Sequence, residues 1–380
     1  MNQIHRGLAG VVVDTTGIST VVTETNSLTY RGYPVQDLAA YRSFEEVAYL
    51  LWYGELPDPA QSRDFQARER ALRPLDRAAT EIVTRLPSTC HPMDVLRTAV
   101  SYLGTQDPTE DDGTPAANRA KSLALLARLP AVVAADQRRR RGLDPIQPDP
   151  SLSLAENFFH MCFGAVPAPE VVRCFEISLI LYAEHSFNAS TFTARVVTST
   201  LSDLYSAVTA AIGALKGPLH GGANEAVMHM LQEIGEPERA EAWLDRALSD
   251  RRKIMGFGHR VYKHGDSRVP IMRQALDRLI AVSDDPQVKR LARLHSALEQ
   301  AMIDRKGIHP NLDYPAGLAY HLMGFDIPVF TPIFVMSRIT GWTAHIAEQL
   351  QANVLIRPLG TYTGPGQRPL PSTRRADSPG

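Results

Sequence analysis

The chain has 380 residues, of which 44% are hydrophobic and 21% are charged, a length that suits a large domain with a smaller one. Its formal net charge of -1 at pH 7 gives no sign of a nucleic-acid or membrane-surface partner, although local basic clusters could bind a small anion. The three cysteines form no C-x-x-C pair, and no segment resembles a signal peptide or the roughly 20 apolar residues that span a bilayer, so we expect a cytoplasmic protein.

Predicted β structure is confined to the N-terminal region. Two short β-branched runs, 10–13 and 18–23, flank a Thr-Gly turn and predict a small hairpin. Helical signals follow, because Ser43 and Glu46 form a capping-box pattern and Gly54 is placed to end that helix. The predicted fold class is therefore all-α with a minor N-terminal β hairpin. Further helices are expected over 153–164, 204–216 and 291–307.

Two segments, 105–118 and 137–150, are rich in Pro, Gly and polar residues and are expected to be surface loops. The second contains four consecutive arginines, 138–141. A phosphate or nucleic-acid patch is one interpretation of this run, but the solvated end of a helix is the favoured one. The tail after Thr363 is rich in Pro, Gly and Arg, and we expect it to be loosely attached.

Four polar clusters stand out because each places ionisable groups beside glycines or at helix ends. Taken singly they are ambiguous: a histidine between glycines can be a turn residue, and Asn311 with Asp313 can form a helix N-cap. The histidines lack H-x-x-x-H or H-x-H spacing, which argues against a metal site. Gly256 and Gly258 lack the third glycine of a dinucleotide-binding loop. The clusters cover residues 184–190, 217–224, 255–268 and 310–317.

In this order and spacing, the four clusters resemble the citrate synthase family. The third cluster matches the family signature G-F-G-H followed by D-x-R. Ser267 departs from that signature, where proline is usual, and this should change loop rigidity more than chemistry. The resemblance implies a large helical domain formed by 1–221 and 328–380 and a smaller, mobile, CoA-binding domain formed by 222–327. Further similarity covers 7–10, 28–33, 44–56 and 357–364, so it spans nearly the whole chain.

The resemblance also implies the reaction, in which an acyl-CoA condenses with oxaloacetate and the product thioester is then hydrolysed. Asp313 would remove a proton from the carbon beside the thioester while His220 donates to the thioester oxygen, because a free enolate is too costly. His259 would donate to the ketone oxygen of oxaloacetate. No metal or other cofactor is expected, since histidines and arginines supply the electrophilic assistance.

The same pattern implies which residues bind the two substrates. Guanidinium groups suit the two carboxylates of oxaloacetate, and a buried arginine such as Arg338 needs an anion. Oxaloacetate would be bound by His185, Arg268, Arg338 and Arg357, the last supplied across the interface of a homodimer. The CoA moiety would contact Ile254, Met255, Gly256, Phe257, Gly258, Lys263, Lys306 and Asn311.

Three functions remain open from the sequence. Acetyl-CoA as the acyl donor, giving citrate, is favoured. Propionyl-CoA, giving 2-methylcitrate, differs by one methylene, which is worth only about 1–3 kcal/mol in an apolar pocket. A CoA- or dicarboxylate-binding protein without turnover is the alternative from another class, and the presence of all three catalytic residues argues against it. The chain lacks the long N-terminal β extension of NADH-inhibited hexameric members, so we expect a dimer without that regulation.

Overall fold

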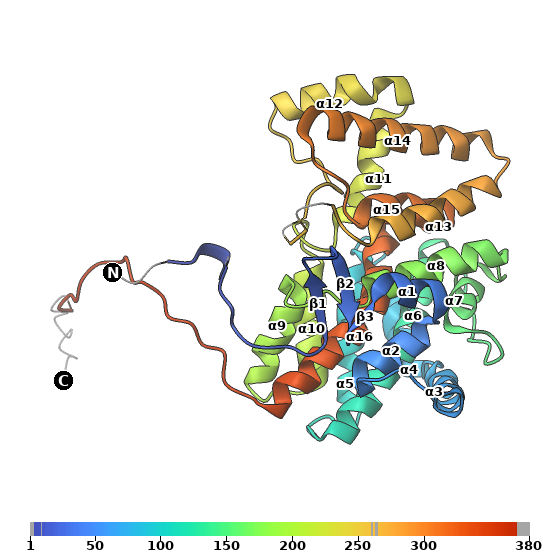
Figure 1. Cartoon of the computed structure of the whole chain (residues 1–380). Coiled ribbons are helices and arrows are strands. Elements are labelled where there is room, and N and C mark those ends of the chain that lie inside the picture. Colours follow the sequence, from blue (N-terminus) through green and yellow to red (C-terminus); the bar gives the residue numbers. More distant parts are fainter. Residues whose placement is uncertain (1–3, 9, 260, 263–264, 371–380) are drawn as a thin grey trace, which may run out of the picture.

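The fold is almost entirely helical. The computed structural model describes residues 4–8, 10–259, 261–262 and 265–370. These residues form sixteen α-helices and one three-stranded sheet, which confirms the predicted all-α class with minor β structure (Figure 1). The main body contains α1 (Val35–Tyr41), α2 (Phe44–Tyr53), α3 (Pro59–Leu72), α4 (Arg77–Arg85), α5 (Pro92–Thr105), α6 (Pro115–Arg140), α7 (Leu154–Phe163), α8 (Pro169–Tyr182), α9 (Ala189–Ser199), α10 (Leu204–Leu215) and α16 (Phe330–Gln351).

A second group of helices lies at one end of this body (Figure 1). The chain enters the group after α10 and returns to the body in α16, and α13 packs against α8. The domain boundaries expected at 221/222 and 327/328 stay a prediction. The group contains α11 (Ala223–Ile234), α12 (Ala240–Ser249), α13 (Val269–Ala281), α14 (Pro286–Lys306) and α15 (Asp313–Leu322).

The small sheet differs from the predicted hairpin. It consists of β1 (Ser19–Val22), β2 (Ser27–Tyr30) and β3 (Tyr33–Pro34), paired antiparallel in that order. The run 10–13 is not a strand, so half of the predicted hairpin is wrong. The polar turn after β1, where Asn26 has a φ of 47°, reverses the chain at once and pairs β1 with the segment that follows it. That segment buries Leu28 and Tyr30 in the core, an anchor that 10–13 does not have.

The helix ends follow the local signals. Ser43 and Glu46 form the expected capping box, and Gly54 ends α2 in the left-handed region with a φ of 90°. The same pairing recurs at the start of α7, and glycines in the same region end α7 and α14. The loop expected over 105–118 is shorter than predicted, because the side chain of Thr114 caps α6 and the helix begins at Pro115.

The arginine run forms the end of α6 and the turn after it, as the favoured interpretation expected, but it is less solvated than that interpretation supposed. Its charges are used within the chain rather than left to solvent. Arg139 and Arg140 pair with Asp136, one helical turn earlier, at 2.7 and 2.8 Å. Arg141 binds both carboxylate oxygens of Asp326, at 3.0 and 2.9 Å. This run therefore does not offer an unpaired phosphate-binding patch.

The helix α16 forms the centre of the body and packs against α2, α6, α8, α9 and α10. Every residue from 330 to 346 is buried, including the polar side chains of Arg338 and His345. A helix that is buried on all sides belongs to the interior, so its polar residues require partners there. Within the described residues, no helix is long and apolar enough to cross a membrane. Beyond α16, residues 352–370 contain no helix or strand. Asn353 and Ile356 still bond to Ser199 of α9, and the chain then runs away from the body (Figure 1).

Candidate active site

A cavity of about 860 Å³ lies where the second group of helices meets the body, a size typical of small-molecule sites. It is lined by residues of all four polar clusters, which come from distant parts of the chain. The structure thus brings together twelve of the residues singled out from the sequence. They are His185, His220, Ile254, Met255, Gly256, Phe257, Gly258, His259, Arg268, Asn311, Asp313 and Arg338.

Asp313 is the first residue of α15 and presents a carboxylate to the cavity. Its backbone N–H donates to Oδ1 of Asn311 at 3.1 Å, although Leu312 and not Asn311 is the N-cap residue of the helix. The Tyr182 hydroxyl, at the end of α8, donates to Asp313 Oδ1 at 2.6 Å. Burial raises the pKa of Asp313 to about 6, while the bond from Tyr182 and the charge of Arg268 oppose the rise. Such a carboxylate is ionised at neutral pH and is a stronger base than an ordinary one.

This arrangement predicts a pH dependence. We expect kcat/KM to fall as the pH drops through about 6, because Asp313 then becomes protonated. Tyr182→Phe removes a donor that stabilises the ionised carboxylate, so this limb of the profile should move to higher pH. Tyr205→Phe is a matched control, because its hydroxyl donates to Asp107 at 2.7 Å, outside the cavity. A profile that is unchanged by Tyr182→Phe would contradict the link to Asp313.

His220 lies in the turn between α10 and α11, and its ring is held by the start of α9. The Ser190 backbone N–H donates to Nε2 at 3.3 Å, and the Ser190 hydroxyl lies 2.8 Å from the same atom. Because a backbone N–H can only donate, Nε2 carries a lone pair and the ring proton is on Nδ1. Burial lowers the pKa of His220 to about 4, with a further contribution from Arg338. The imidazole is therefore a neutral hydrogen-bond donor at physiological pH.

His259 and His185 form an imidazole pair, with ring centroids 4.9 Å apart. The backbone N–H of Val261 donates to His259 Nδ1 at 3.1 Å, which leaves Nε2–H as the donor. Burial, together with the charge of Arg268, lowers the pKa of His259 to about 4. His185 Nε2 lies 3.1 Å from the Tyr262 hydroxyl, and burial lowers its pKa well below the usual value. Both rings are neutral.

Two buried arginines make one end of the cavity cationic. Arg268 is held by Asp266 in a bidentate pair, with Nε–Oδ1 and Nη2–Oδ2 distances of 2.9 and 2.7 Å. Arg338 is only 2% exposed and donates from Nε to the Tyr182 carbonyl at 2.7 Å. Its Nη1 has no partner among the described residues. A buried guanidinium with an unused donor is costly, so this end of the cavity suits an anion.

The loop 254–258 also lines the cavity and is fixed to the residues just before α15. The Asn311 side chain donates to the Gly258 carbonyl, and its backbone N–H donates to the Gly256 carbonyl, both at 2.9 Å. Gly256 has a φ of 81°, and a Cβ there would lie 2.6 Å from Val227 and 2.9 Å from Tyr314. Only glycine fits, so the loop backbone lies directly against the neighbouring helices.

Two of the residues singled out from the sequence do not line the cavity. Lys306 is exposed in the last turn of α14, and Arg357 is exposed in the segment after α16. Lys263 lies outside the described residues. Sequence reasoning, in turn, assigned no role to Tyr182, Ser190 or Asp266, which hold Asp313, His220 and Arg268. All three stood in or beside the polar clusters, but only the folded chain shows what their side chains contact.

Known proteins similar to this chain agree on one family. The family described as citrate synthase, C-terminal domain, matches residues 7–359. A 2-methylcitrate synthase from Mycobacterium tuberculosis is 64% identical over 98% of this chain and 93% of its own length. A citrate synthase from Mycolicibacterium smegmatis is 63% identical over 97% of each chain. The citrate synthase of Thermoplasma acidophilum, solved as a ternary complex with carboxymethyl coenzyme A and oxaloacetate, has a TM-score of 0.92 at 33% identity, covering 97% of this chain and 98% of that one. The chain therefore belongs to the citrate synthase family and is an acyltransferase.

Proposed function

We propose that this enzyme condenses a short acyl-CoA with oxaloacetate and hydrolyses the resulting thioester to release CoA. The observation that carries this proposal is the convergence of Asp313, His220 and His259 on one cavity that has a cationic end. A carboxylate with a raised pKa is placed with neutral imidazoles whose free N–H groups can donate. This combination suits proton removal beside a carbonyl followed by attack on a second carbonyl.

Each of the three residues has a defined step. The Asp313 carboxylate takes a proton from the carbon beside the thioester, while His220 Nδ1–H donates to the thioester oxygen as negative charge develops there. The resulting enol carbon attacks the ketone carbon of oxaloacetate, and a new carbon–carbon bond forms. His259 Nε2–H donates to the ketone oxygen, which becomes the hydroxyl of the product. Water then cleaves the thioester, giving the tricarboxylic acid and free CoA.

The cationic end binds the oxo acid in this proposal. Arg338 offers the unused Nη1 donor, and Arg268 is aligned by Asp266 for a second carboxylate contact. His185 lies beside His259, next to the ketone. The loop 254–258 and Asn311 receive the CoA arm in this proposal, and Lys263 and Lys306 stay predicted contacts of the same moiety. The solved relative from Thermoplasma acidophilum, described with oxaloacetate and a CoA derivative, supports the choice of these two classes of ligand.

The acyl donor is acetyl-CoA as the first candidate and propionyl-CoA as the second. Relatives named for each product are almost equally similar, at 63% and 64% identity. Release of free thiol from both acyl-CoAs, with and without oxaloacetate, tests the proposal directly. Oxaloacetate-dependent release is expected, and the ratio of the two kcat/KM values identifies the donor. The absence of such release from both compounds would leave the binding protein without turnover as the better description.

The active form in this proposal is a homodimer with shared sites. Arg357 lies in the exposed segment after α16, which runs away from its own body (Figure 1). Its guanidinium does not line the cavity of its own chain. A partner subunit that packs against the body would bring its own arginine of this segment to the oxaloacetate end, and the second group of helices would close over the bound oxo acid.

A further inference from the structure

A buried carboxylate lies directly behind the cationic end of the cavity. Glu184 is fully buried in the bend between α8 and α9, one residue before His185. Its Oε1 accepts hydrogen bonds from Ser19 Oγ and from His345 Nε2, both at 2.9 Å. Its Oε2 has no partner among the described residues. The sequence analysis placed Glu184 in a polar cluster but gave it no function.

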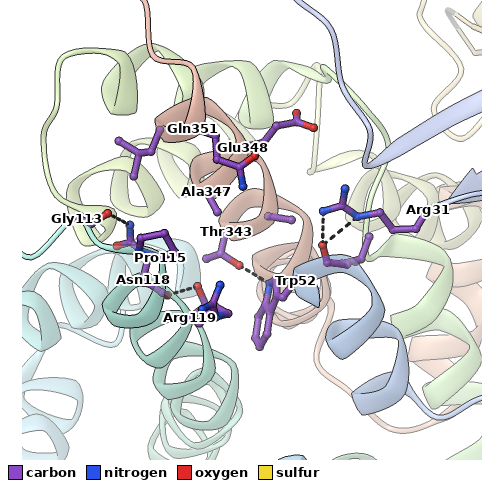
Figure 2. Close-up of a pocket in the computed structure, with 14 residues that line it drawn as sticks. Arg31, Trp52, Gly113, Pro115, Asn118, Arg119, Thr343, Ala347, Glu348 and Gln351 are labelled. Carbon is purple, nitrogen blue, oxygen red and sulfur yellow. Dashed lines mark hydrogen bonds between the residues drawn. The ribbon is translucent and has the colours of Figure 1, made fainter. Parts of the chain in front are cut away.

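The neighbouring histidine does not neutralise this carboxylate. Arg195 Nε donates to His345 Nδ1 at 3.0 Å, so the ring carries its proton on Nε2 and donates it to Glu184. The charge of Arg195 is in turn paired with Glu348, whose other oxygen accepts from the Gly17 backbone. Figure 2 shows Glu348 at the wall of a separate cavity of about 170 Å³, farther along α16. The negative charge of Glu184 is therefore left for another partner.

Arg338 of α16 is a buried cation near this carboxylate, because its Nε donates to the carbonyl of Tyr182, two residues before Glu184, although no ion pair joins the two side chains among the described residues. A Cβ on Gly341 would lie 2.2 Å from Glu184 Oε2, so the free carboxylate oxygen rests against the helix backbone at this glycine. Arg338 precedes Gly341 by three residues, so its Cβ lies about 5–6 Å from that position on the same side of α16, while its guanidinium lies over the ring of Phe334. Arg338 also has a free donor, Nη1. Burial lowers the pKa of Arg338 to about 10, and the charge of Glu184 opposes that shift.

We propose that Glu184 is the standing counter-ion of Arg338 in the empty site and that it thereby limits the affinity for the dianionic oxo acid. Glu184 is a positioning residue, because it acts on substrate through Arg338. Before substrate binds, it compensates a buried guanidinium charge. Once a carboxylate occupies Nη1, Glu184 repels it, which keeps the affinity moderate. The part of the inference that concerns affinity rests on the proposed function.

Glu184→Gln tests this role, because it keeps the size and the acceptor of the side chain and removes only the charge. We expect the Kd for oxaloacetate, measured by calorimetry, to fall by about fivefold to tenfold, since a like charge near the ligand is lost. Glu348→Gln removes a charge of the same sign from the same network, but next to Arg195, and should leave this Kd unchanged. Ser19→Ala removes a neutral hydrogen bond to Glu184 and should not tighten binding.

An unchanged or higher Kd in Glu184→Gln would overturn the proposal, because it would show that Glu184 only supports the bend that carries His185. A ligand-free measurement covers the case in which this variant folds poorly. The counter-ion role predicts that Arg338→Gln is destabilised and that the double variant Glu184→Gln/Arg338→Gln is more stable in urea than the sum of the single changes. Additive losses would contradict the pairing. Failure of the wild-type protein to bind oxaloacetate would instead refute the proposed function. The comparison of the single and double variants in urea would still test the pairing of Glu184 with Arg338.

Discussion

Asp313→Asn is expected to reduce the rate of oxaloacetate-dependent thiol release by about 10³-fold, because the cavity then lacks its general base. The amide keeps the size of the side chain and can still accept from Tyr182, so the substrate-binding residues should stay in place. The KM values should change much less than kcat. Initial rates at saturating concentrations of both substrates measure the loss. Asp64→Asn, which removes an exposed carboxylate outside the cavity that lies 3.6 Å from Arg68, is the control and should retain activity.

The stability of this variant separates loss of chemistry from loss of fold. Burial raises the pKa of Asp313 to about 6 from its ordinary value of 3.8, so the folded state holds the proton more tightly than the unfolded chain. At pH 7 the ionised side chain therefore destabilises the fold, and that penalty disappears as the pH falls below about 4. A neutral amide should make the protein at least as stable at pH 7. Near-normal turnover in a well-folded Asp313→Asn would refute the assignment of the base.

Arg357→Ala is expected to weaken oxaloacetate binding strongly and to be rescued by a second, differently inactive subunit. In the shared-site dimer, a heterodimer of Arg357→Ala with Asp313→Asn has one complete site, made from the intact Asp313 of one chain and the intact Arg357 of the other. Random mixing of equal amounts should restore about a quarter of the wild-type activity, since half of the dimers are mixed and each has one good site. Thiol release after refolding the two variants together measures this recovery.

Absence of any recovery after mixing would contradict the shared site. If Arg357 served its own chain, each mixed dimer would contain one site without the arginine and one without the aspartate, and mixing would restore nothing. Refolding each variant alone is the control for recovery caused by the procedure itself. Light scattering on the same samples checks that the proteins are dimers.

The local part of the structure could be predicted from the sequence because its causes lie within a few residues. The capping box of Ser43 and Glu46 and the end of α2 at Gly54 involve only near neighbours. The N-terminal hairpin was half wrong because β pairing depends on which segment can bury its side chains, and Leu28 and Tyr30 do so while 10–13 does not. Side-chain periodicity alone does not decide between two such partners.

In the active site, too, local motifs could be predicted and long-range contacts could not. The cavity-lining residues were found from their motifs, but the residues that tune them were not. Tyr182 and Asp313 are 131 positions apart, and Ser190 and His220 are 30 positions apart, so no local pattern links them. The neutral state of each histidine also depends on its burial, which follows from the packing of distant helices.

Arg141, the residue just after α6, affects how the enzyme would open and close. Arg141 clamps the segment through which the chain returns to the body, because it binds Asp326 and donates to the Gly324 carbonyl at 2.9 Å. A rotation of the second group of helices about the body would thus take place at or before Gly324, the residue that follows α15 closely and has a φ of 87°. The residues from 325 onward would stay fixed to the body, and Arg338 would keep its place through every cycle of substrate entry and product release.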